Sequence, residues 1–272
     1  MELILRTGLE NTATENGKPS RMLGYALDPA RLRPLLGIGI FLLLWEIIVA
    51  SQLAPENYLP PFHAILGTIA DPGTASVLLL QSLITLARAL AGYLIAAAIA
   101  VPFGIFLGRS ALISEIMSPL IEFLRPLPSS TIIPVALLFL GLGAKMIVFV
   151  VAFGAAWPIL VAARQGAEHV DPVMMDVARL LRLGKTRINL EVVLPAAMPF
   201  VMGGLRTSLA VSLILAVTAE MLAGNNGIGF FILDMERAFR VQEMYAGILS
   251  IGVLGYLLNL AFQAMERKIV YW

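Results

Sequence analysis

The sequence contains no cysteine and few charged side chains. Without cysteine the chain has no disulfide framework, no thiolate metal site and no cysteine nucleophile. Charged residues make up 14% of the chain and hydrophobic residues 59%, whereas a soluble domain typically has about a quarter charged residues. Its polar side chains are too few to cover a soluble core of this size. With a mean hydropathy of +0.87, the chain is predicted to be an all-α integral membrane protein with lipid as its outer solvent.

Nucleic-acid binding and enzyme chemistry also lack support in the sequence. The net charge is only +1 and there is no long run of lysine and arginine, so a nucleic-acid partner is not expected. The two histidines, His63 and His169, lie in polar segments, and neither belongs to an H-E-x-x-H or nucleophile motif. We therefore expect no catalytic residue, no metal site and no bound cofactor in this chain.

Apolar runs divide the sequence into a short polar lead-in and a membrane domain. A spanning helix needs roughly 20 mostly apolar residues. Residues 1–33 mix both charges without a sustained apolar core, which favours a cytoplasmic segment over a secretory signal. Residues 34–272 are predicted to form the membrane domain, with a polar loop at 165–197. Six spans are expected, at 34–51, 74–108, 126–143, 146–163, 198–222 and 244–265.

The positive-inside rule orients these spans. With both termini inside, the cytoplasmic segments would hold Arg6, Lys18, Arg21, Arg31, Arg33, Arg109, Arg164, Arg179, Arg182, Lys185, Arg187, Arg267 and Lys268. The outer segments would hold only Lys145, Arg237 and Arg240. The loop 165–197 is therefore expected in the cytoplasm. Arg88, within the long second run, is expected to snorkel at the outer interface.

The cytoplasmic loop has the pattern of a helix–turn–helix. Asp171-Pro172 is a good helix start, since Asp can cap free N–H groups and Pro suits the first helical position. Apolar residues then follow a helical stripe as far as Gly184, which is expected to end the helix. A second short helix is expected at 186–193, stopping at Leu194-Pro195. An ordered helix with an apolar stripe outside the bilayer needs a partner surface, although an ordinary amphipathic connector has the same pattern.

The loop and the wider chain resemble a known family. Asp176-Val177-Ala178 followed by Val192-x-Leu194-Pro195 is similar to the cytoplasmic loop signature of bacterial ABC importer permeases, Glu-Ala-Ala, Gly, then Ile-x-Leu-Pro. The wider chain resembles the nitrate, taurine and alkanesulfonate subfamily. That resemblance is carried by Leu59-Pro60-Pro61, Ser82, Arg88, Gly92-Tyr93, Pro119, Arg125-Pro126-Leu127-Pro128, Gly141-Leu142-Gly143, Pro158, Pro195-Ala196-Ala197-x-Pro199, Gly204-Leu205-Arg206, Ala219-Glu220-Met221, Gly227-Ile228-Gly229 and Trp272. Three positions depart from the loop signature: Asp176 replaces Glu, Val177 replaces the first Ala, and Arg182 replaces Gly.

This resemblance implies a type I ABC importer fold in a bacterial inner membrane. It implies two copies of the chain surrounded by lipid, two cytoplasmic ATPase subunits that bind the ATP, and an extracytoplasmic substrate-binding protein. No G-x-x-x-x-G-K-[ST] phosphate loop occurs in this chain, consistent with ATP binding elsewhere. The residues expected to dock the ATPase are Asp171, Val173, Met174, Asp176, Val177, Ala178, Arg179, Leu181, Arg182, Gly184, Leu194 and Pro195.

The sequence indicates the residues of the translocation path less clearly than those of the cytoplasmic loop. Small, hydroxyl and basic residues that could line it are Ser129, Ser130, Thr131, Arg206, Ser208 and Ser212, but small residues also serve helix packing in membranes. A small anionic solute such as a sulfonate, taurine, nitrate or bicarbonate is expected. The alternative function is a secondary, ion-coupled transporter that works without an ATPase, although the two halves show no convincing repeat.

Overall fold

A computed structural model describes residues 29–53, 55 and 57–269, and every regular element in them is a helix. The chain divides into two compact units, Met1–Pro55 and Glu56–Trp272, each considered by itself. The first unit contains α1 (Pro29–Ala50). The second contains α2 (Phe62–Ala70), α3 (Pro72–Arg109), α4 (Ala111–Leu124), the 3-10 helix η2 (Ser129–Ile132), α5 (Ile133–Leu140), α6 (Ala144–Glu168), α7 (Pro172–Leu180), α8 (Lys185–Ile188), the π-helical turn η3 (Asn189–Val193), α9 (Leu194–Ala223), α10 (Ile228–Arg237) and α11 (Val241–Ile269). The all-α prediction is confirmed.

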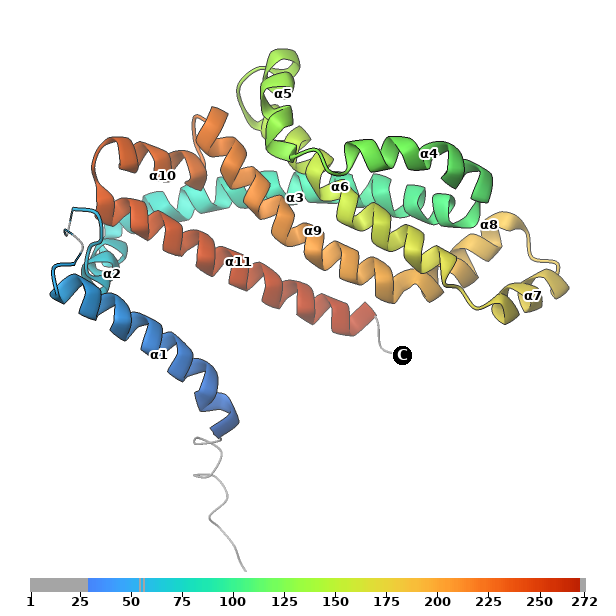
Figure 1. Cartoon of the computed structure of the whole chain (residues 1–272), viewed down its shortest axis with the longest axis horizontal. Helices are drawn as coiled ribbons and strands as arrows, with labels where there is room; N and C mark the ends of the chain where they lie inside the picture. Colours follow the sequence, from blue (N-terminus) through green and yellow to red (C-terminus); the bar gives the residue numbers. More distant parts are fainter. Residues whose placement is uncertain (1–28, 54, 56, 270–272) are drawn as a thin grey trace, which may run out of the picture. The chain divides into compact units, whose positions relative to one another are not determined.

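Three long helices, α3, α6 and α9, pack along one another and form the core of the second unit (Figure 1). Their contact faces carry glycines where the backbones come close. A Cβ atom added at Gly104 of α3 would lie 2.7 Å from the Cβ of Ala163 in α6, and one at Gly204 of α9 would lie 3.0 Å from the carbonyl oxygen of Pro158. Small residues permit this close approach in lipid, where dispersion contacts hold helices together.

Four helices in the described residues are long and apolar enough to cross a membrane: α3, α6, the continuous helix Lys185–Ala223, and α11. A fifth crossing is possible if α4 and the helix Ser129–Leu140 are taken as one broken span, bent by 85°. The predicted single helix at 126–143 is therefore wrong. Pro126 and Pro128 lack the N–H groups that an uninterrupted helix needs, and the chain turns there. In α1 the apolar stretch Leu36–Ala50 is shorter than these spans, so the count of six is not confirmed.

Helix α7 ends earlier in the chain than the sequence pattern predicts. Its last helical residue is Leu180, and Arg182 follows with φ +54°, in the left-handed region. The amide of Arg182 donates to the carbonyl of Arg179 (2.9 Å) and the amide of Leu183 to that of Ala178 (3.2 Å), the two hydrogen bonds of a Schellman turn. The predicted end at Gly184 is therefore wrong. The left-handed residue is thus Arg182, the position at which the resemblance leads us to expect glycine.

The segment after this turn runs into the membrane domain without a stop. α8, η3 and α9 form one continuous helix, Lys185–Ala223, so the predicted termination at Leu194-Pro195 is wrong. The π-helical turn lies directly before Pro195, which is at the start of α9. A wider turn changes the hydrogen-bond register of the backbone, which lets the helix continue through a proline that cannot donate.

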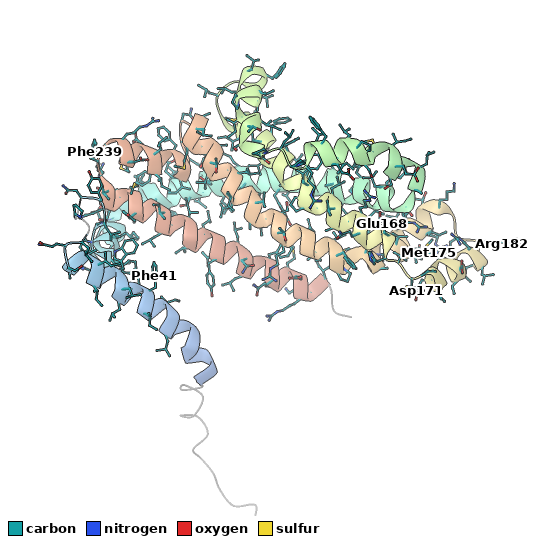
Figure 2. All side chains as sticks on the ribbon, viewed as in Figure 1. Phe41, Glu168, Asp171, Met175, Arg182 and Phe239 are labelled. Carbon is teal, nitrogen blue, oxygen red and sulfur yellow. The ribbon has the colours of Figure 1, made fainter. Side chains whose placement is uncertain are left out.

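Helix α10 ends in a second Schellman turn. Phe239 has φ +55°, its amide donates to Glu236 (3.0 Å), and the amide of Arg240 donates to Met235 (2.9 Å). α10 packs against α9 and α11. Figure 2 shows Phe239 at one end of the second unit, with Asp171, Met175 and Arg182 at the opposite end.

Candidate functional site

Helix α7 presents an exposed apolar face. Val173, Met174, Val177, Leu180 and Leu181 are between 49% and 81% exposed, and we call these five residues the α7 face. The hydrophobic stripe predicted from the sequence is thus real, and it is left uncovered by the rest of the described chain.

The opposite side of α7 holds the helix against its own membrane domain. Met175 and Ala178 are 6% and 2% exposed, and Met175 belongs to the core cluster that includes Ala163 and Val193. Ala178 is predicted from the sequence to approach the ATPase, but in the structure it faces inward. The apolar surface offered by α7 therefore comes from the α7 face, including Leu180, which is absent from the predicted docking residues.

Polar residues around α7 shape its ends and surface. The side chain of Asp171 accepts from the amide of Val173 (2.8 Å), which confirms the predicted cap. Asp176 and Arg179 form an exposed ion pair at 3.0 Å. Leu194 and Pro195 are half-buried at the start of α9, and Gly184 is exposed in the turn, so these three predicted docking residues lie off the helix itself.

A buried ion pair lies toward the other end of the second unit. The Nη1 of Arg88 in α3 is 2.8 Å from Oε1 of Glu220 in α9, and the two side chains are 9% and 0% exposed. Glu220 also accepts from the hydroxyl of Thr85 (2.7 Å) and the amide of Gly229 (3.2 Å). The predicted snorkelling of Arg88 is therefore wrong, because its charge is neutralised by a partner 132 residues away in the sequence.

Hydrogen bonds around the same ion pair hold the loop between α9 and α10 in place. Arg88 donates to the backbone oxygen of Asn226 (2.9 Å) and also to its side-chain oxygen. Gln81 and Thr85 accept from the amides of Gly227 (2.6 Å) and Ile228 (2.8 Å). Gly227 has φ +100°, and a Cβ atom there would collide with the carboxyl group of Glu220. The Gly227-Ile228-Gly229 motif therefore places the amide of Gly229 on the buried carboxylate and the amides of Gly227 and Ile228 on Gln81 and Thr85 beside it.

A cavity of about 750 Å³ opens between α6 and α9. Its lining comes from the bend after α4, from the middle and later turns of α6, and from the early turns of α9: Arg125, Ser129, Gly154, Trp157, Pro158, Val161, Ala162, Gln165, Pro199, Phe200, Gly203, Gly204 and Thr207. Pro158, which lies within the uninterrupted helix α6, forms part of the cavity wall. The sequence does not indicate that Arg125 belongs to a site with Trp157 and Gln165, because Arg125 reaches these two α6 residues only through the bend at 125–128.

The predicted path residues separate into different environments. Ser129 lines the cavity, and the next residue, Ser130, is half-buried. The hydroxyl of Thr131 donates to the carbonyl of Pro128 (2.6 Å). Arg206 lies 3.9 Å from Glu266 of α11 and lines a separate cavity of about 290 Å³.

Two further predicted path residues are buried between helices. Ser208 is 0% exposed and donates across to the carbonyl of Ala155 in α6 (2.6 Å). Ser212, also 0% exposed, donates to the carbonyl of Leu209 in its own helix (2.7 Å). In this structure both serines lie where helices pack together. This agrees with the second interpretation of the sequence, helix packing, rather than with lining of the path.

Comparison with known proteins places this architecture in a defined class. Residues 100–271 match the family described as the binding-protein-dependent transport system inner membrane component. The chain belongs to this family of integral-membrane permease subunits. It is 30% identical over 256 residues to the nitrate import permease protein NrtB of Synechocystis sp., covering 91% of this chain and 92% of that protein.

Other relatives carry different substrate names. The bicarbonate transport system permease protein CmpB of Synechococcus elongatus is 31% identical, covering 88% of this chain and 89% of that protein. The taurine transport system permease protein TauC of Escherichia coli is 28% identical, covering 86% and 87%. Among solved structures, a chain of the inward-facing MetNI methionine ABC transporter has a TM-score of 0.66 at 17% identity, covering 74% of this chain and 99% of that one. The fold is thus that of ABC importer permeases.

Proposed function

We propose that this chain is the permease subunit of an ATP-driven importer and forms the path for a small anionic solute delivered by an extracytoplasmic binding protein. Two copies would pair in a bacterial inner membrane, with both termini and α7 in the cytoplasm and one ATPase bound to each copy. The family membership and the ABC importer fold support this assembly. The names of the relatives, which include nitrate, bicarbonate and taurine permeases, support the anionic class of solute.

The observation that carries the proposal is the exposed α7 face. Met175 and Ala178 anchor the helix on the permease, while the five apolar side chains of the face remain exposed beyond the core. Contiguous exposed apolar surface of this kind marks an interaction site. The ion pair of Asp176 and Arg179 lies beside it, where polar contacts would form a rim. We infer that this face seats in a groove of the ATPase and transmits its movement to α9.

The test is the replacement of Leu180 and Leu181 by glutamate. Burying one leucine contributes about 1.5–3 kcal/mol, so removing two should weaken ATPase binding by at least tenfold. The measurement is co-purification of the ATPase at a series of protein concentrations, together with ATP-dependent solute uptake in proteoliposomes. Phe239→Glu is the matched control, because Phe239 is 87% exposed but lies at the opposite end of the unit (Figure 2).

The outcomes separate the proposal from an ion-coupled carrier. Loss of both ATPase binding and uptake in the Leu180/Leu181 variant, with ATPase binding kept in Phe239→Glu, supports the docking role. Unchanged co-purification and uptake in that variant would show that α7 is an ordinary connector. Uptake that persists without ATP and stops when ion gradients are collapsed would establish the secondary transporter instead.

A further inference from the structure

The lining of the cavity between α6 and α9 has one formal charge among the described residues, and it is positive. Arg125 supplies it, and no aspartate or glutamate of the described chain lies in the wall. The hydroxyl of Ser129 and the amide group of Gln165 add neutral hydrogen-bond donors from two different elements. A wall with a guanidinium, extra donors and no carboxylate from the described residues is electrostatically suited to an anion.

Arg125 is exposed at the cavity and has no acidic partner among the residues that the structure describes, unlike three arginines elsewhere in the same unit. Arg88 pairs with Glu220, Arg164 with Glu168 and Arg206 with Glu266. Arg125 immediately precedes Pro126 at the sharp bend between α4 and η2, which directs this residue to the cavity rather than along a helix surface. Its guanidinium is therefore available to an external ligand.

Trp157 provides a second, independent indication. Its indole Nε1 is shielded from solvent and is the one buried side-chain nitrogen or oxygen without a hydrogen-bond partner in the described part of the chain. The ring packs edge-on against Phe153, with centroids 5.4 Å apart, and forms part of the cavity wall. A buried donor without an acceptor costs free energy. An oxygen atom bound beside the indole would give this N–H an acceptor.

We propose that this cavity is a weak binding site for a small oxyanion of single negative charge, held by Arg125 and donors of Ser129, Gln165 and Trp157. The planar guanidinium can donate two parallel hydrogen bonds to two oxygens of one anion. Pockets for small molecules measure roughly 300–1,000 Å³, so about 750 Å³ leaves room for hydration water or a short carbon chain. Phe200 and Val161 supply apolar wall for such a chain. The inference rests on the proposed function, since it locates the solute within the path.

The experiment compares Arg125→Gln with Arg109→Gln in full-length permease assembled with its ATPase and binding protein in proteoliposomes. Arg109 is an exposed cation at the end of α3 and does not line the cavity. Uptake of labelled nitrate, bicarbonate and ethanesulfonate is measured separately. We expect Arg125→Gln to lower uptake of the transported anion at least tenfold, Arg125→Lys to restore part of it, and Arg109→Gln to change it less than twofold. Co-purification of the ATPase checks that each variant is folded.

A second readout observes the cavity directly. In permease carrying Trp45→Phe and Trp272→Phe, Trp157 is the single remaining tryptophan, because the chain has three. Its emission is titrated with each of the three anions. We expect a saturable change with at least one of them, and we expect Arg125→Gln to abolish it. A nonspecific quenching effect would be the same in both proteins and would count against the site.

The two proposals fail separately. If the parent complex transports one of the anions but Arg125→Gln transports it equally well, or if no anion changes the Trp157 emission saturably, the oxyanion site is refuted and the importer function stands. If the parent complex shows no ATP-dependent uptake, the importer function fails, while the emission titration on the permease still decides the anion site.

Discussion

Separating the buried ion pair of Arg88 and Glu220 should strongly destabilise the membrane domain. Glu220 is 0% exposed, and Arg88 at 2.8 Å supplies its neutralising charge. Arg88→Met would leave the carboxylate with the hydroxyl of Thr85 and the amide of Gly229. Removing one member of a buried pair costs about 3–5 kcal/mol, because the other charge stays desolvated. For a chain of this size the expected fall in the unfolding midpoint is roughly 6–20 °C.

Thermal unfolding in detergent measures this loss, and a double-mutant cycle isolates the pair. Arg88→Met with Glu220→Gln removes both charges, so we expect it to regain much of the stability lost in Arg88→Met. The exposed pair of Asp176 and Arg179 is the control: its N–O distance is 3.0 Å, but both side chains are 67% exposed, so Arg179→Met should cost at most about 1 kcal/mol. Additive effects at Arg88 and Glu220, or a loss in Arg88→Met no larger than in Arg179→Met, would refute the reasoning.

Local backbone geometry and capping lead to three more predictions. Arg182→Gly should slow amide exchange in α7 by about two- to fivefold. Glycine removes the roughly 1–2 kcal/mol cost of a left-handed arginine, and its greater loss of backbone entropy on folding offsets part of that gain. Unchanged exchange would argue against strain at this residue. Gly104→Ala places a Cβ 2.7 Å from both the Cβ of Ala163 and the backbone oxygen of Leu160, and should lower thermal stability by about 1–3 kcal/mol; Ala163→Gly removes only the first contact and should rescue part of the loss. Hydrogen bonds from Thr74 lower the pKa of Asp71 below its usual 3.8, so its cap stabilises α3 above that value and is lost as pH falls through the lower folded pKa. Asp71→Ala should remove that part of the acid dependence of the unfolding midpoint, and an identical pH profile in the variant would contradict the assignment.

The helical class and the exposed face of α7 are predictable from the sequence because both depend on local patterns. Apolar runs of span length identify helices directly, and a 3.6-residue period identifies which side chains share a face. The stripe from Val173 to Leu181 therefore follows from the order of the residues alone, as does the cap at Asp171. Both are present.

Features that depend on distant partners are not predictable in the same way. Snorkelling is the natural expectation for Arg88 because its own neighbourhood in the sequence contains no acid, whereas Glu220 lies 132 residues further along the chain. Arg125 has no evident role in the sequence because only the 85° bend brings it to α6 and α9. Helix ends are also difficult to place: Gly184 near the end of α7 indicates a stop, but the chain adopts the left-handed conformation two residues earlier, at Arg182.

The continuity of the helix Lys185–Ala223 has a mechanical consequence. At 1.5 Å per residue its 39 residues measure about 58 Å. One end lies beside the turn that carries Arg182, and the other holds Glu220 and the start of the loop clamped by Arg88. Because no loop interrupts this helix, a movement of α7 that reaches Lys185 would be passed along the backbone toward Glu220 without a flexible connection between these two residues.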